Sequence, residues 1–201
     1  SRKKIGIKAD CIVISILPGS RSSEVKWNLD IMLGSANIIQ SKLNNVLFSI
    51  PCNNKENFEK INMGIRKHKL LNIKPIIGHS HDVINASDLV IVASGTATLE
   101  AALFKKPMLI IYRSSWWSWQ ILSRMKIIPW IGLPNILLNK LISPELLQER
   151  ANPEEIANEA LKIINDKKYK RLINKEFTEL HKSLRRNTSN LILDILKKYI
   201  K

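Results

Sequence analysis

The sequence predicts an α/β domain, in which a parallel sheet carries helices on both faces. Short apolar runs rich in β-branched residues, such as Leu89–Ala93 and Met108–Tyr112, alternate with segments of helical periodicity. This alternation is typical of right-handed β-α-β crossovers in a parallel sheet. Two apolar runs end in turns of small residues, Pro18–Arg21 and Ser94–Thr96. Because ligands bind beyond the carboxyl ends of such strands, both turns are candidate binding sites.

The first half of the chain divides into alternating elements. The predicted strands are Cys11–Leu17, Val46–Ile50 and Lys74–Ile77, and the predicted helices are about Ser23–Leu43, Asn54–Lys69 and Asp82–Ala86. We expect Ser22 or Ser23 to cap the first helix, because a hydroxyl oxygen can accept a hydrogen bond from a first-turn N–H. Glu24 then lies where a negative charge favours the helix dipole. Pro51, which has no N–H, is expected to stop the second strand.

The segment that follows is the most informative part of the chain. Leu89–Ala93 has the composition of a strand buried on both faces. It stops at Ser94–Thr96, and helix formers continue from Ala97 to Leu103 before the buried strand Met108–Tyr112. Unpaired N–H groups and the dipole at a helix N-terminus attract an anion, and Gly95 lets that anion approach closely. The junction therefore predicts an anion site.

Glu100 lies in the helix that starts at this junction. Ala97 stands three residues before it, so Glu100 cannot complete a capping box, which needs Ser or Thr at that spacing. An acid beside an anion site needs another role. We interpret Glu100 as an acceptor of hydrogen bonds from sugar hydroxyls.

A second junction contains Gly19, Ser20 and Arg21. The Arg21 guanidinium is suited to a bidentate contact with a phosphate. Alone, this motif fits a tight turn with a solvated arginine better than a phosphate site, but two such junctions in one sheet favour the phosphate interpretation. No Gly-Lys-Ser/Thr follows either glycine and no GxGxxG occurs, which weighs against an ATPase or a dinucleotide oxidoreductase.

The C-terminal part supplies further candidate residues. Tyr112 and Arg113 end a strand on the same edge of the sheet, and Asn135 follows a rigid turn. Ser143-Pro144 predicts the N-terminus of a helix whose dipole Glu145 complements, although this leaves Gln148 unexplained. Beyond this point the pattern is helical, with predicted helices at Pro153–Asn165, Lys168–Leu184 and Thr188–Tyr199.

Composition limits the class of protein. The chain has 201 residues, 45% hydrophobic and 24% charged, and no apolar run of membrane-spanning length, as expected of a globular domain and not of a disordered chain. Two cysteines are too few for a disulfide scaffold and fit a reducing cytoplasm. His79, His81 and Asp82 lack further ligands nearby, so no metal site is predicted.

The net charge of +15 fits several partners. Nucleic acid, an anionic membrane surface and phosphorylated substrates would each explain it, as would a compositional bias without function. Four tryptophans, Trp116, Trp117, Trp119 and Trp130, lie close together with cations among them. Such a segment fits a membrane interface, stacking on single-stranded nucleic acid, or packing against another domain.

Five motifs in this order resemble the lipid-A-disaccharide synthase family: PGSR (18–21), ASGTATLE (93–100), KPMLIIYR (106–113), LPN (133–135) and PELLQ (144–148). That family consists of inverting glycosyltransferases of the two-domain GT-B architecture. The resemblance covers nearly all of the chain but only the family's C-terminal half. It implies a Rossmann-like UDP-binding domain over residues 1–165 and C-terminal helices over residues 166–201. These helices would cross to an N-terminal acceptor domain, either covalently joined or a separate partner.

The resemblance also implies a reaction and a set of residues. The donor would be UDP-2,3-diacylglucosamine and the acceptor 2,3-diacylglucosamine 1-phosphate, joined at the cytoplasmic face of the inner membrane without a metal or other cofactor. Arg21 and Asn135 are the implied catalytic residues. The implied substrate-binding residues are Gly19, Ser20, Ser94, Gly95, Thr96, Glu100, Tyr112, Arg113, Glu145 and Gln148. Among these, the turns at Gly19 and Gly95 would hold the diphosphate and Glu100 the ribose.

Two other interpretations stay open at this stage. The same Gly95 and Glu100 site would serve another UDP-sugar glycosyltransferase or a UDP-sugar epimerase. The charge and the tryptophans would also suit a nucleic-acid-binding module, although the basic residues are spread through every helix and form no stripe. The resemblance to the synthase family instead implies lipid substrates and no nucleic acid.

Overall fold

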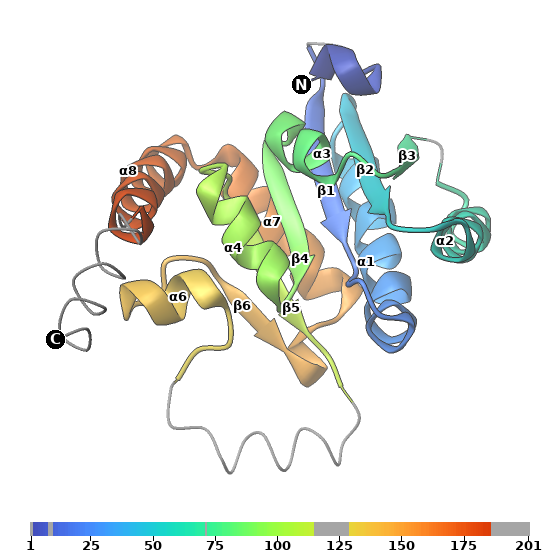
Figure 1. Ribbon diagram of the computed structural model, residues 1–201. Helices are drawn as coiled ribbons and strands as arrows, with labels where there is room; N and C mark the ends of the chain where they lie inside the picture. Colours follow the sequence, from blue (N-terminus) through green and yellow to red (C-terminus); the bar gives the residue numbers. More distant parts are fainter. Residues whose placement is uncertain (1, 8–9, 71, 115–128, 186–201) are drawn as a thin grey trace, which may run out of the picture.

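The computed structural model describes residues 2–7, 10–70, 72–114 and 129–185 (Figure 1). Its centre is a parallel sheet of six strands in the order β3-β2-β1-β4-β5-β6. The strands are β1 (Ile12–Leu17), β2 (Val46–Cys52), β3 (Ile73–Ile77), β4 (Leu89–Ala93), β5 (Met108–Tyr112) and β6 (Glu145–Leu147). The strand order reverses between β1 and β4, which are neighbours although two strands separate them in the chain. In a doubly wound sheet, this switch point is where ligands bind.

The helices form a layer on each face of the sheet. They are α1 (Ser22–Lys42), α2 (Lys55–Lys67), α3 (Ser80–Ala86), α4 (Thr96–Leu103), α6 (Leu133–Leu138), α7 (Pro153–Asn165) and α8 (Lys167–Leu184), with short 3-10 helices η1 (Arg2–Ile5) and η2 (Gln148–Arg150). α1, α2 and α7 pack on one face, whereas α3, α4, α6 and α8 lie on the other (Figure 1). The predicted α/β fold class is therefore confirmed.

Burial explains why the strand at the centre of the sheet is continuously apolar. All five residues of β4 are buried. Leu89, Ile91 and Ala93 belong to the core beneath α1 and α7, while Val90 and Val92 belong to the core beneath α4 and α8. Side chains alternate between the faces of a strand, so a strand covered on both sides must be apolar at every position.

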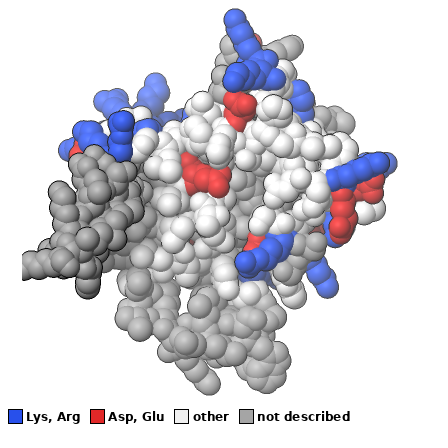
Figure 2. All heavy atoms as spheres, in the orientation of Figure 1, with Lys and Arg blue, Asp and Glu red and all other residues white. Residues whose placement is uncertain are grey.

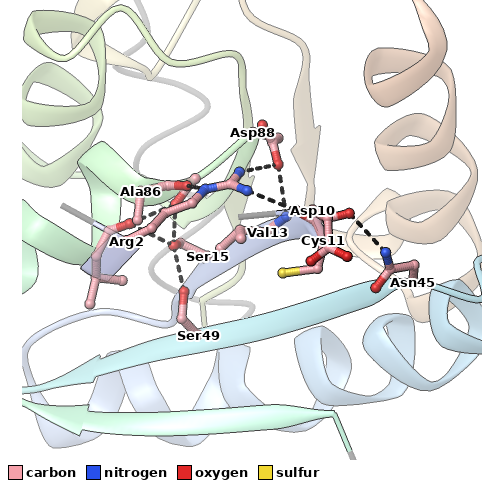
Figure 3. A network of polar contacts seen from close by, with 11 residues as sticks. Arg2, Asp10, Cys11, Val13, Ser15, Asn45, Ser49, Ala86 and Asp88 are labelled. Carbon is pink, nitrogen blue, oxygen red and sulfur yellow. Dashed lines mark hydrogen bonds and ion pairs between the residues drawn. The ribbon is translucent and has the colours of Figure 1, made fainter. Parts of the chain in front are cut away.

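A polar network links β1 to β4 at the N-terminal ends of both strands, opposite the ends that carry the predicted anion sites (Figure 3). The Arg2 guanidinium donates to the carbonyl oxygens of Ala86 and Cys11 at 3.1 and 2.9 Å, and to the Asp88 carboxylate at 2.8 Å. The same carboxylate accepts the N–H of Val13 at 2.8 Å. These bonds hold together the two strands whose far ends carry the predicted anion sites.

The predicted end of the second strand and the predicted N-cap of the first helix are both wrong. The second strand continues through Pro51 to Cys52. Phe48 donates its N–H to the Asn72 carbonyl oxygen, on the side of β3. Backbone N–H groups alternate between the two sides of a strand, so the nitrogen of Pro51, three residues on, faces β1. The pairing of β1 with β2 ends at Ser49. The missing N–H therefore breaks no ladder bond. At α1 the N-cap residue is Arg21, and neither Ser22 nor Ser23 has that position.

The helix predicted to begin at Pro144 is also wrong. Glu145–Leu147 forms the edge strand β6, and a single 3-10 turn follows it. Ile110 of β5 donates its N–H to the Pro144 carbonyl oxygen at 2.9 Å. Pairing with β5 thus overrides the local helix-start signal, because the ladder and the burial of Leu146 exist only in the folded chain.

The other predicted strands and helices lie at or close to their predicted positions, except for the helix Thr188–Tyr199, which is outside the described residues. The segment before Asn135, predicted as a rigid turn, instead begins the helix α6. α8 packs onto the domain through Ile173, Phe177 and Leu180, all of them buried. None of the helices that the structure describes is long and apolar enough to cross a membrane.

Candidate functional site

The two predicted anion sites face one cavity. β1 and β4 pair in register up to Leu17 and Val92, so the turns that follow them leave the sheet side by side. Between these turns lies a cavity of ≈ 380 Å³. Its lining residues are Leu17, Pro18, Gly19, Ser20, Arg21, Glu24, Pro51, Asn53, Ser80, Ala93, Ser94, Gly95, Thr96, Ala97 and Glu100. Six of the residues predicted to bind substrate are among them, together with Arg21, which was predicted to be catalytic.

The first turn joins β1 to α1. Gly19 has a φ of 119°, a conformation that favours glycine. Asn28, buried one turn into α1, holds this turn by donating to the Pro18 carbonyl oxygen at 3.2 Å. The Arg21 side chain is 82% exposed, and its Nη1 atom lies 3.5 Å from Oε1 of Glu24. The guanidinium is therefore free to reach an anion in the cavity.

The second turn joins β4 to α4. A β-carbon placed on Gly95 would meet no atom within 4 Å, so this turn is open. Thr98 closes the first turn of α4 by donating its N–H and its hydroxyl to the Gly95 carbonyl oxygen, at 3.1 and 2.7 Å. The Ser94 hydroxyl donates to the Ile131 carbonyl oxygen at 3.0 Å. The Ser94 side chain is therefore hydrogen-bonded to the backbone before α6, and Gly95 and Thr96, at the N-terminus of α4, line the cavity.

Glu100 lies on the cavity wall and has a neighbour that sequence analysis missed. Its Oε2 atom is 3.6 Å from Nε2 of His81, on α3. The His81 ring also packs against the Phe104 ring, with 5.7 Å between the centroids. The Glu100 carboxylate is 40% exposed, so it remains accessible to a hydroxyl-bearing ligand.

The remaining predicted residues form a separate cluster around β6 and are absent from the cavity lining. Asn135 is fully buried. Its Nδ2 donates to the Ser143 carbonyl oxygen and to Glu145 Oε1, both at 2.8 Å. Its Oδ1 accepts the N–H groups of Ile142 and Ser143 at 3.0 and 2.9 Å. All of these hydrogen bonds are made within the protein, so the Asn135 side chain stabilises the fold.

Glu145 and Gln148 extend this cluster to the edge of the sheet. The Glu145 carboxylate accepts the N–H of Gly132 at 2.9 Å and that of Ile131 at 3.0 Å. Gln148 Oε1 accepts the N–H of Ser114 at 3.0 Å. Both side chains therefore position the backbone before α6 and after β5. Tyr112 is half-buried and Arg113 is exposed on the same edge.

Sequence analysis missed three polar residues of the cavity lining, Asn53, Ser80 and Glu24. Asn53 follows β2 and therefore stands at the carboxyl end of a third strand. Because the predicted strand ended at Ile50, Asn53 was not recognised as a candidate. Ser80 begins α3, which was predicted to start two residues later. Glu24 was interpreted only as an acid that complements the helix dipole, and its contact with the cavity depends on the turn before it.

Burial raises the pKa of the Tyr169 hydroxyl and of the Cys52 thiol, and neither residue is among those that line the cavity. Over the described part of the chain, no group of three or more His, Cys, Asp and Glu residues could hold a metal ion. Figure 2 shows Lys and Arg mostly toward the margins of this face, and a patch of Asp or Glu near its middle.

The fold defines the class of protein first. Sucrose-phosphate synthase from Thermosynechococcus elongatus is similar over 98% of this chain and 47% of its own, with a TM-score of 0.64 and 12% identity. WaaG, a glycosyltransferase involved in lipopolysaccharide biosynthesis, gives a TM-score of 0.63 at 15% identity, over 92% of this chain and 46% of that chain. The C-terminal CMP-Kdo binding domain of Acinetobacter baumannii WaaA covers 89% of this chain and 91% of its own length, with a TM-score of 0.60 and 10% identity. The chain therefore shares the Rossmann-like α/β fold of domains in these proteins.

The sequence then defines the family. The chain belongs to the lipid-A-disaccharide synthetase family, whose model it matches over residues 1–196. The lipid-A-disaccharide synthase of Methylobacillus flagellatus is 40% identical over 100% of this chain and 54% of that enzyme. That of Dechloromonas aromatica is 36% identical over 94% of this chain and 50% of the enzyme. The chain spans about half the length of the curated relatives it matches, and the resemblance drawn from its motifs is confirmed.

Proposed function

We propose that this chain is the donor-binding half of a lipid-A-disaccharide synthase. The donor is UDP-2,3-diacylglucosamine, the acceptor is 2,3-diacylglucosamine 1-phosphate, and the products are their disaccharide and UDP. One observation carries the proposal. In a chain of this family, the turns after β1 and β4 face a single cavity that has Glu100 on its wall.

In this proposal the UDP diphosphate lies between the N-termini of α1 and α4. Both termini offer backbone N–H groups and the positive ends of helix dipoles to it. Arg21, whose guanidinium is exposed beside the first turn, neutralises part of its charge. Glu100 accepts hydrogen bonds from the ribose hydroxyls, which places the nucleoside beside α4.

The same groups favour departure of UDP. When the anomeric C–O bond breaks, positive charge develops on the sugar ring and negative charge on the diphosphate. Fixed N–H dipoles and the Arg21 guanidinium stabilise this charge without reorganising, and one such preorganised donor is typically worth about 3–4 kcal/mol in the transition state. Asn135, fully buried, supports the site as a positioning residue through Glu145 and the backbone around β6.

We assign the acceptor side of the reaction to the half of the family's enzymes that this chain does not cover. Inversion needs a general base on the opposite face of the sugar to accept the acceptor's proton. We assign that base to the N-terminal half of the family, so residues 1–165 bind donor and residues 166–201 continue toward the acceptor domain. Both substrates carry acyl chains, which places the enzyme at the cytoplasmic face of an anionic membrane. The tryptophan-rich segment proposed to contact this membrane lies mostly outside the described residues.

Calorimetric titration with UDP tests the proposal. The 201-residue chain is expected to bind UDP saturably, and Arg21→Ala and Glu100→Gln are each expected to weaken binding about tenfold or more, as loss of a hydrogen bond to a charged group does. Arg66→Ala and Glu154→Gln are matched controls, because both residues are exposed and outside the cavity. Failure to saturate at millimolar UDP would contradict the proposal.

A second titration separates the lipid A reaction from the other nucleotide-sugar activities. The protein in which this chain is combined with its acceptor domain is expected to prefer diacylated over unacylated UDP-glucosamine. Preference for the unacylated compound would instead identify another UDP-sugar transferase or an epimerase.

A further inference from the structure

The carboxylate of Glu24 occupies part of the predicted diphosphate site. Glu24 lies in the first turn of α1, and its side chain folds back over the turn that precedes the helix. Its Oε2 atom accepts the N–H of Ser20 at 3.1 Å and that of Arg21 at 3.4 Å. Its Oε1 atom lies 3.5 Å from the Arg21 guanidinium. An anionic group thus already contacts three of the donors assigned to the diphosphate.

Gly19 makes this arrangement possible. A β-carbon at Gly19 would lie 2.5 Å from the Glu24 Cβ atom and 2.6 Å from Oε2, closer than any real contact. The glycine therefore leaves space that the Glu24 side chain fills. At the second turn, by contrast, the corresponding space beside Gly95 is open. The two turns of the cavity differ in that only the first is covered by a side-chain carboxylate.

We propose that Glu24 is an internal counter-anion, which the diphosphate of the ligand displaces from the turn at Gly19. The inference rests on the proposed function, because it takes the diphosphate as the group that binds there. In the empty protein, Glu24 neutralises Arg21 and satisfies the N–H groups of Ser20 and Arg21. When the ligand arrives, its oxygens replace the carboxylate, and the Glu24 side chain, which is 34% exposed, turns toward solvent.

Charge makes this displacement measurable. A carboxylate and a diphosphate that compete for the same N–H groups repel each other at close range, so Glu24 lowers the affinity for the diphosphate. Glu24 also caps α1, since it accepts the N–H of the N-cap residue Arg21, but an uncharged cap at this position would have no such effect. In the full enzyme the same competition favours release of UDP, the product that carries the diphosphate.

The test compares Glu24→Gln with the unchanged chain. The amide keeps the size of the side chain and one hydrogen-bond acceptor, but it removes the charge. Glu24→Gln is expected to tighten binding of inorganic pyrophosphate and of UDP about tenfold at low ionic strength, with a smaller gain as salt screens the repulsion. Binding of uridine, which has no phosphate, is expected to stay unchanged. Glu24→Ala is expected to act in the same direction.

Glu56→Gln is the matched control, because Glu56 is an exposed acid in the first turn of α2 and outside the cavity. It changes the net charge equally and is expected to leave both affinities unchanged. Thermal melting of each variant verifies folding. Equal or weaker pyrophosphate binding by Glu24→Gln would overturn the inference. If Glu24→Gln tightens pyrophosphate while neither protein binds UDP, the proposed function fails and the role of Glu24 stands.

Discussion

At the scale of single residues, the two predicted catalytic residues, Asn135 and Arg21, lie in different environments. Arg21 is exposed beside the cavity, where a guanidinium can contact a ligand. Asn135 is buried and hydrogen-bonded through both its amide atoms to Ser143, Ile142 and Glu145. A sequence motif gives the two residues equal standing, whereas burial separates a group that can touch substrate from one that positions other groups.

Replacing Asn135 is therefore expected to affect stability before binding. Asn135→Ala leaves the N–H groups of Ile142 and Ser143 without their acceptor, and a buried unpaired polar group costs about 1–3 kcal/mol. Urea unfolding measures this loss, with Asn165→Ala, at an exposed position at the end of α7, as control. A folded Asn135→Ala protein of unchanged stability that no longer binds UDP would show direct ligand contact instead.

At the scale of elements, the pairing of β1 with β4 decides the geometry of the site. Their register places the two turns side by side, and the Arg2–Asp88 network secures the other end of the same pair (Figure 3). Neither strand alone forms a site, because each contributes only one turn. The cavity depends on their adjacency at the switch point of the sheet.

Loss of Arg2 is expected to loosen this pair. Arg2→Met removes the hydrogen bonds from a partly buried guanidinium to Ala86 and Cys11 and the ion pair with Asp88, which we expect to cost about 1–3 kcal/mol. Guanidinium chloride unfolding and the UDP affinity are to be measured together, with exposed Lys3→Met as control. Unchanged stability would mean that backbone pairing alone secures the two strands.

At the scale of the whole molecule, α8 belongs to the same core as the sheet. Its buried residues join those of α4 and β5 in one hydrophobic cluster. The predicted boundary at residue 165 therefore separates two functional assignments within a continuous packing unit, at least up to the last described residue of α8. The proposed continuation toward an acceptor domain concerns the residues beyond it.

Truncating a buried side chain of α8 tests this packing. Phe177 is fully buried, and Phe177→Ala is expected to destabilise the entire domain by about 3–5 kcal/mol, as cavity formation in a core does. Leu172→Ala, at an exposed position of the same helix, is expected to cost far less. A single unfolding transition shifted to lower denaturant indicates one cooperative unit. A separate early transition would show that α8 unfolds independently.

Much of the architecture could be predicted from local patterns. β-branched runs such as Leu89–Ala93 predict buried strands, because only strands covered on both faces are apolar throughout. The helix Pro153–Asn165 was predicted with its observed bounds, since proline, acidic residues and apolar periodicity all agree there. The edge strand Glu145–Leu147 could not be predicted, because its helix-like start signal competes with pairing to a distant strand.

By itself, the sequence determined the fold class, the two turns with glycine, and the motifs that identify the family. These depend on residues close together in the chain. Only the tertiary structure decided that the two turns share one cavity, that Asn135 and Glu145 hold the fold, and that Glu24 covers the first turn. Each of these depends on which strands are adjacent and on how side chains fold back in space, and neither is encoded in local spacing.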